Sequence, residues 1–113
     1  MKRRIAILLV SFSILPALVV RYQLASADES AQRRIHHVAI KGFKFDPEKL
    51  EVEAGDTVVW TNEDIVPHIV VADKFKSRSL DQGESWSLKT KQKGNFSYIC
   101  KFHPTMKAEL IVN

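Results

Sequence analysis

Short extended stretches separated by turn residues fill most of the chain after residue 35, and they constrain its fold more than any other feature. Each stretch alternates between apolar and polar residues or is rich in β-branched and aromatic residues, as strands are. The expected strands are residues 38–40, 43–45, 50–53, 57–61, 68–71, 85–88, 95–100 and 108–112, and residues 73–83 are expected to form a surface loop. Many short strands at this spacing predict an all-β sandwich.

The N-terminal part of the chain has the pattern of a secretory signal peptide. It has a basic start at residues 2–4, an apolar run over residues 5–20 and the sequence Ala-Ser-Ala at residues 25–27. This order is typical of a segment that is cleaved on export. We therefore expect cleavage after Ala27 and export to the periplasm. An uncleaved N-terminal membrane anchor is the alternative, although the apolar run is shorter than the roughly 20 residues of a membrane span.

Removal of residues 1–27 leaves a short polar lead-in at residues 28–34 and one domain at residues 35–113. Of the 17 Lys and Arg residues, four precede residue 28, so 13 remain to balance the 13 Asp and Glu residues. Such a neutral domain gives no reason to expect nucleic-acid binding. Contact with a membrane is expected only through an uncleaved signal segment, and we expect a monomer.

Cys100 is the only cysteine of the chain, so it has no internal disulfide partner. In an oxidising compartment such a thiol needs an intermolecular disulfide or a metal. His103 and Met106 follow it at intervals of three residues, in a short loop after an expected strand. Thiolate, imidazole and thioether are ligands that suit copper. His68, at the start of another expected strand, is the candidate for a fourth ligand.

Two histidines, a cysteine and a weak axial methionine together define a blue, or type 1, copper site for electron transfer. A rigid site of this kind reorganises little between Cu(I) and Cu(II), so single electrons pass quickly. The predicted function is an exported protein that shuttles single electrons between redox partners. The alternative is a periplasmic copper carrier, in which the same residues bind Cu(I) without a redox role.

The sequence argues against an enzyme. Multicopper oxidases have histidines beside the cysteine, but Ile99 and Lys101 flank Cys100 here. A binuclear copper site of the oxidase type needs two cysteines. Four protein ligands would also leave no open position for a substrate.

His36 and His37 are adjacent in the chain, and adjacent strand residues point to opposite faces of a sheet. They are therefore not expected to share one metal ion. We expect both histidines to be surface residues near the N-terminal end of the domain. A weak accessory metal site is the alternative.

The chain resembles the small type 1 copper proteins of the cupredoxin superfamily, and among them the amicyanins. The resemblance covers residues 43–112 and is carried by residues 52–62, Pro67-His68, residues 94–100 and the C-x2-H-x2-M ligand loop. It implies a Greek-key β-sandwich with one copper ion at one end. It also implies a dehydrogenase as electron donor and a cytochrome c as acceptor.

The resemblance further implies that the imidazole edge of His103 is exposed within an apolar docking patch, to which Phe102, Pro104 and Pro67 contribute. One departure concerns Ile69, which follows the first histidine ligand where these proteins usually have asparagine. That asparagine side chain links the two loops that carry the ligands. Its replacement is expected to change the potential and the rigidity of the site, but not the ligand set.

Overall fold

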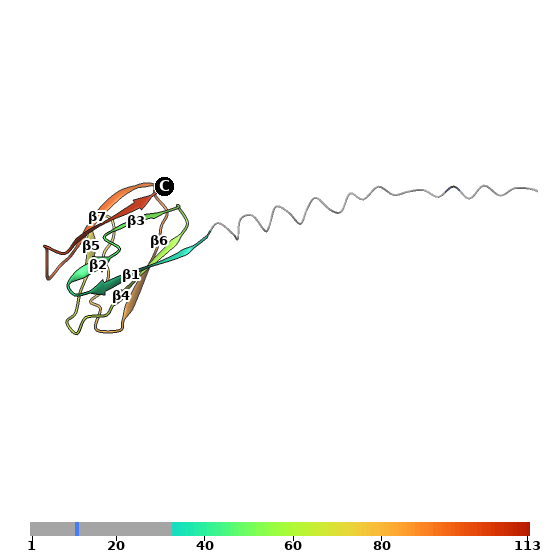
Figure 1. Ribbon diagram of the computed structural model, residues 1–113. Coiled ribbons are helices and arrows are strands. Elements are labelled where there is room, and N and C mark those ends of the chain that lie inside the picture. The colour runs from blue at the N-terminus through green and yellow to red at the C-terminus, as the bar shows by residue number, and fades with distance from the viewer. Residues whose placement is uncertain (1–10, 12–32) are drawn as a thin grey trace, which may run out of the picture.

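The structure is a computed structural model that describes residue 11 and residues 33–113 (Figure 1). Apart from residue 11, the predicted signal peptide at residues 1–27 lies outside the described residues, as does most of the lead-in. Among the described residues there is no helix of the length and apolar character that crosses a membrane. The eight strands are β1 (Ile35–Lys41), β2 (Lys44–Asp46), β3 (Lys49–Val52), β4 (Thr57–Asn62), β5 (Val70–Ala72), β6 (Ser85–Lys89), β7 (Gly94–Cys100) and β8 (Lys107–Val112).

The strands form two four-stranded sheets, with the orders β2-β1-β4-β6 and β3-β8-β7-β5. Two pairs are parallel, β1 with β4 and β3 with β8, and the other neighbours are antiparallel. The consecutive strands β1 and β2 share one sheet and β7 and β8 the other, whereas every other consecutive pair, such as β2 and β3 or β4 and β5, lies in different sheets. The predicted all-β Greek-key sandwich is therefore confirmed.

Period-two alternation decides which side chains fill the space between the sheets. In β4, Val58, Trp60 and Asn62 are buried while the residues between them are partly exposed. In β7, Tyr98 and Cys100 are buried on the same face as the half-buried Phe96. The aromatic rings of Trp60 and Tyr98 lie edge to face, 5.6 Å apart, at the centre of the core. The alternation that fills the core thus also points the Cys100 thiol inward.

The ends of the expected strands differ from the structure, and three of these differences have a clear cause. Strand β1 begins at Ile35 rather than residue 38, because Ile35 pairs with Thr57 of β4. The expected strand at residues 43–45 begins only at Lys44, because Phe43 belongs to a turn with a positive φ of 59°. Regular pairing of β5 begins at Val70, and His68 forms an isolated bridge with Leu80.

The expectation of a surface loop at residues 73–83 is wrong for part of that segment. Leu80 is buried in the core, and Ser77 is buried beside β5. The Ser77 hydroxyl accepts a hydrogen bond from the Val70 amide at 2.8 Å, and the amide and carbonyl of Leu80 bond to the backbone of His68. The polar composition of residues 73–83 gave no sign that these two residues face inward.

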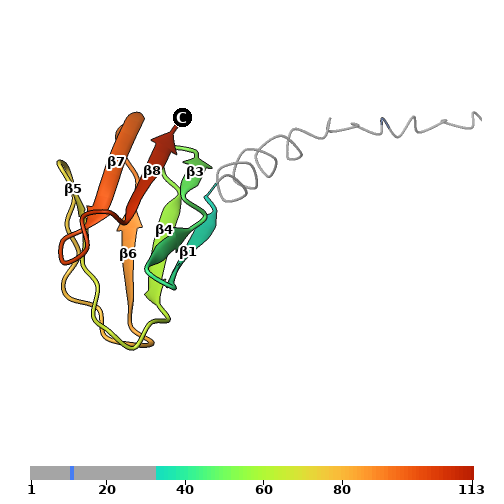
Figure 2. The same ribbon diagram turned by 60° about the vertical axis from the view of Figure 1, so that its left-hand side comes forward.

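The loop between β7 and β8 projects at the end of the sandwich away from the start of β1, as Figures 1 and 2 show. Strand β4 ends at Asn62 and strand β7 ends at Cys100, near the isolated bridge that holds His68. The sandwich therefore brings two segments together at this end, the β4–β5 connection with His68 and the β7–β8 loop with the other predicted ligands.

Candidate metal centre

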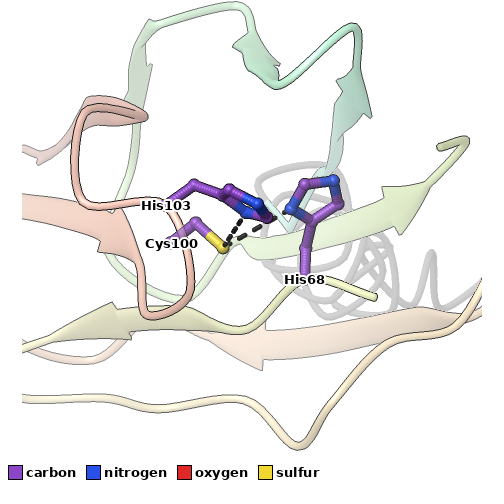
Figure 3. A group of neighbouring side chains, drawn as sticks. All are labelled: His68, Cys100 and His103. Atoms are coloured by element: carbon purple, nitrogen blue, oxygen red, sulfur yellow. Dashed lines mark hydrogen bonds between the residues drawn. The ribbon is translucent and has the colours of Figure 1, made fainter. Parts of the chain in front are cut away.

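Three of the four predicted ligands converge on one point. The Nδ1 atom of His68 lies 3.4 Å from the Sγ atom of Cys100, and the Nδ1 atom of His103 lies 3.8 Å from the same sulfur (Figure 3). The donor atoms of the three side chains all lie within 4.8 Å of one another. His68 comes from the segment between β4 and β5, whereas Cys100 and His103 share the β7–β8 loop.

The β7–β8 loop is held in a compact shape by its own backbone. The His103 amide donates to the Cys100 carbonyl, and the Met106 amide donates to the His103 carbonyl at 2.9 Å. The Cys100 amide donates to the Met106 carbonyl at 3.2 Å, which closes the loop before β8 begins. Cys100 and Met106 are both buried in the same apolar cluster. The loop thus keeps its sulfur-bearing side chains inside the sandwich.

His68 is fully buried and is held on several sides. Its backbone exchanges two hydrogen bonds with Leu80, of 2.8 and 3.1 Å. The Asn62 side chain bonds to the carbonyls of Leu80 and Val66, so it shapes the loop that leads to the histidine. The Nε2 atom of His68 lies 2.9 Å from the Asp64 carboxylate. Because Nε2 donates to this carboxylate, Nδ1 is left as a free lone pair toward Cys100.

The Asp64 carboxylate is shifted toward its charged form. Burial alone raises its pKa, but hydrogen bonds from the amides of Phe43 and Gly42 and from His68 outweigh burial and lower the pKa below the ordinary value. A charged carboxylate is a strong acceptor for an imidazole N–H, so it favours one tautomer of His68.

Sequence reasoning missed both Asp64 and Phe43. Asp64 lies four residues before His68, and an acid at that distance from a metal-binding histidine is a usable signal for its hydrogen-bond partner. The ring of Phe43 makes edge contacts with both His68 and His103, at centroid distances of 5.5 and 4.9 Å. No local sequence pattern predicts that contact, because the β1–β2 turn is far from both histidines in the sequence and lies beside them only in the folded protein.

Ile69 is buried, and its carbonyl accepts a hydrogen bond from the Lys101 amide at 3.0 Å. The segments that follow the two ligands His68 and Cys100 are therefore joined by the backbone. This link does not depend on the side chain at position 69.

The residues predicted to form a docking patch are exposed. Phe102 is 52% exposed, and Pro104 and Pro67 are also exposed, while His103 is partly exposed. Phe43 adds a further exposed aromatic ring in contact with His103. Phe43 thus places an exposed aromatic ring beside one candidate ligand.

His36 and His37 do not approach one metal position. His36 is partly buried, and its Nε2 atom lies 2.9 Å from the buried Asp56 carboxylate, whereas His37 is exposed. His37 is thus exposed at the surface, whereas the partly exposed His36 is also tied to a buried carboxylate. Within residues 33–113, the group of His68, Cys100 and His103 is the one cluster of such side chains with metal-binding geometry.

A family model described as "Cupredoxin-like domain" matches residues 12–112. The chain belongs to the cupredoxin-like family. It is 28% identical to an amicyanin of Paracoccus versutus, over 79% of this chain and 71% of that protein. It is 32% identical to amicyanin-alpha of Methylorubrum extorquens, over 66% of this chain and 69% of that protein.

A solved structure of amicyanin from Paracoccus versutus superposes with a TM-score of 0.66 at 26% identity, over 70% of this chain and 81% of that one. The predicted resemblance to amicyanins is therefore confirmed. Amicyanins are electron carriers rather than enzymes, in agreement with the prediction that this cupredoxin is not an enzyme. Proteins of this family bind one copper ion, and the buried thiol and two imidazoles found here suit copper.

Proposed function

We propose that this cupredoxin is an exported type 1 copper protein that passes single electrons, with His68, Cys100, His103 and Met106 as its ligands. The observation that carries the proposal is the convergence of the two Nδ1 atoms on the buried sulfur of Cys100, at 3.4 and 3.8 Å. Met106 is assigned as the weak axial ligand because it is buried in the same loop, three residues after His103.

A copper ion held by these residues would supply a one-electron Cu(I)/Cu(II) couple. The chain itself contributes a site that changes little with oxidation state. Its ligand loops are fixed by the Cys100–Met106 backbone bonds, by the Leu80 bridge to His68 and by the bond between Lys101 and Ile69. Since few atoms need to move, little energy is lost to reorganisation when an electron enters or leaves.

Electrons are proposed to enter and leave through the His103 edge. The surrounding patch of Phe102, Pro104, Pro67 and Phe43 is apolar and exposed, which suits brief docking to another protein. By likeness to amicyanins, the partners are redox proteins, with a dehydrogenase as donor and a cytochrome c as acceptor. The cupredoxin is proposed to act as a monomer, without binding nucleic acid.

Export is proposed from the pattern of residues 1–27, with cleavage after Ala27 and release into the periplasm. The mature protein would then consist of the lead-in at residues 28–34 and the copper domain at residues 35–113. Intact-mass measurement of the protein recovered from the periplasm should give a chain that begins at Asp28. Recovery of the full-length chain in the membrane fraction would show an N-terminal anchor instead.

A visible absorption spectrum of the Cu(II)-loaded protein is the primary test. Electron transfer through a type 1 site predicts an intense thiolate-to-copper band that bleaches with reductant and returns with oxidant. Cys100→Ser should lose this band, while Ser79→Ala, a change on the exposed loop, should keep it. Tight Cu(I) binding without a stable coloured Cu(II) form would favour the copper carrier. Absence of copper binding would refute both functions.

A further inference from the structure

One carboxylate connects a candidate ligand to a distant turn. The Asp64 side chain accepts hydrogen bonds from the His68 imidazole at 2.9 Å, from the Gly42 amide at 2.7 Å and from the Phe43 amide at 3.0 Å. Gly42 and Phe43 form the turn between β1 and β2, more than 20 residues earlier in the chain. Asp64 therefore fixes the position of that turn relative to the metal centre.

The turn holds Phe43 in an unusual conformation. Its φ of 59° lies in the left-handed region, which a bulky residue seldom adopts. Its side chain is 48% exposed, so burial alone does not explain why the ring stays where it is. The hydrogen bonds that the Gly42 and Phe43 amides donate to Asp64 compensate for the backbone strain. They also direct the Phe43 ring toward the metal centre.

The Phe43 ring contacts both candidate histidine ligands edge to face. The interplanar angles are 83° with His68 and 84° with His103. His68 is already held by Asp64, but within the described part of the chain no hydrogen bond reaches the Nε2 atom of His103. The edge contact with Phe43 at 4.9 Å and the tilted contact with the His68 ring at 5.3 Å are therefore restraints on the His103 ring, and Phe43 also contacts His68.

We propose that Asp64 and Phe43 act as one positioning unit for the two histidines. Asp64 selects the tautomer of His68 that leaves Nδ1 free, and through the β1–β2 turn it holds Phe43 against His103. The role in copper binding rests on the proposed function. The effect on the imidazoles themselves does not, since the hydrogen bond to His68 and the ring contact with His103 involve only side chains of this protein.

The tautomer part is tested by long-range ¹⁵N–¹H NMR of the metal-free full-length protein at pH 8. Wild type should show His68 in the Nε2–H form alone. Asp64→Ala should give a mixture of both tautomers, and Asp64→Asn should fall between the two. Glu63→Ala, which removes the adjacent exposed carboxylate, should match wild type. A single Nε2–H tautomer in both Asp64 variants would overturn this part of the proposal.

The ring contact is tested with Phe43→Leu, which removes the aromatic edge, and Phe43→Tyr, which keeps it. In the metal-free protein, Phe43→Leu should shift and broaden the His103 ring signals, while Phe43→Tyr should restore sharp signals near their wild-type positions. Because Phe43 is half exposed, both variants are expected to fold. His103 signals unchanged in Phe43→Leu would show that the contact restrains nothing.

Coupling between the two residues is tested by removing Cu(I) from the loaded protein with a Cu(I) chelator. Each single variant, Asp64→Asn and Phe43→Leu, should speed copper loss by about tenfold. If the two residues form one unit, the double variant should be little faster than the faster single variant. Multiplication of the two effects in the double variant would show independent residues. Failure of the wild-type protein to bind copper would refute the proposed function and leave the NMR results to decide the positioning roles.

Discussion

The amide of Lys101 donates a hydrogen bond to the carbonyl of Ile69 at 3.0 Å. Each residue immediately follows a candidate ligand, Cys100 in one case and His68 in the other. Val70 and Cys100 are paired next to this bond in the β5–β7 ladder. The bond therefore extends the ladder up to the metal centre, and it keeps the two ligand segments in register although residue 69 has an apolar side chain.

Amide hydrogen exchange should detect this link directly. The Lys101 side chain is exposed, yet its amide should exchange at least about tenfold more slowly than the neighbouring Phe102 amide, because it is bonded across the two segments. No acceptor for the Phe102 amide is found among residues 33–113, so it is a matched control on the same loop. Equal exchange of the two amides in the metal-free protein would mean that the link opens freely.

The metal centre was largely readable from the sequence because its main determinants are local. Alternation along β7 predicted that Cys100 faces the core with Phe96 and Tyr98, and the three-residue intervals predicted that His103 would return to the sulfur. The position of His68 depended on a long-range pairing, but its neighbour Pro67 and the strand that follows indicated a loop end. The positions of Cys100 and His103 and the position of His68 could both be inferred because each depends on the backbone geometry of a short segment.

Phe43 and Ser77 show where such reasoning stops. Phe43 alternates with Phe45 as a strand residue would, but it has a positive φ in a turn whose Gly42 and Phe43 amides donate hydrogen bonds to Asp64, 22 and 21 residues later. Ser77 looks like any loop serine, but its hydroxyl completes the hydrogen bonding of Val70 in the core. In both cases the side chain bonds to the backbone of another segment, seven or more residues away, which the alternation within a single strand does not reveal.

Met106→Leu should retain copper and raise the reduction potential. Leucine fills a similar buried volume, so the loop should keep its shape. Loss of the weak axial thioether disfavours Cu(II) more than Cu(I). A tenfold change in the ratio of the two affinities corresponds to about 59 mV for a one-electron couple, and we expect a rise of at least that order. Spectroelectrochemical titration measures it.

Leu110→Met is the control for Met106→Leu, because it exchanges the same two residue types at a buried position of β8. Its potential should equal that of wild type. A wild-type potential in Met106→Leu would remove Met106 from the set of ligands.

Asp56→Asn should destabilise the protein at neutral pH. The buried Asp56 carboxylate accepts hydrogen bonds from the Arg34 amide at 3.0 Å, the His36 imidazole at 2.9 Å and the Glu53 amide at 3.1 Å. An asparagine has one acceptor oxygen and a competing amide donor, so we expect a loss of about 2–3 kcal/mol in the free energy of unfolding. Urea denaturation at pH 7 measures it, with the exposed Asp73→Asn as a control that should change little.

The cost of Asp56→Asn should shrink in acid. The Arg34 amide first, and then the His36 side chain, hold the pKa of Asp56 below its ordinary value of 3.8 against the opposing effect of burial. The unfolded chain therefore takes up a proton at this residue at a higher pH than the folded protein does. The stabilisation is complete well above pH 4 and is lost as the pH falls through the folded pKa. An equal difference between wild type and variant at pH 7 and pH 3 would contradict this assignment.

Tyr98→Phe should make the sandwich more resistant to alkali. The Tyr98 hydroxyl is buried and has no hydrogen-bond partner among the described residues. Burial, opposed in part by the neighbouring Trp60, raises the pKa of Tyr98 to about 12. The unfolded chain loses the phenolic proton near pH 10, so the stability of the wild-type protein should fall between pH 10 and pH 12, by up to about 2–3 kcal/mol.

Tyr98→Phe should lose this slope of stability against pH. At pH 7 its stability should match or slightly exceed that of wild type, because the change removes an unpaired polar group. Lysine deprotonation affects both proteins alike, so parallel alkaline denaturation curves for wild type and Tyr98→Phe would show that the phenol ionises near pH 10 in the folded protein too, as it would if water reached it.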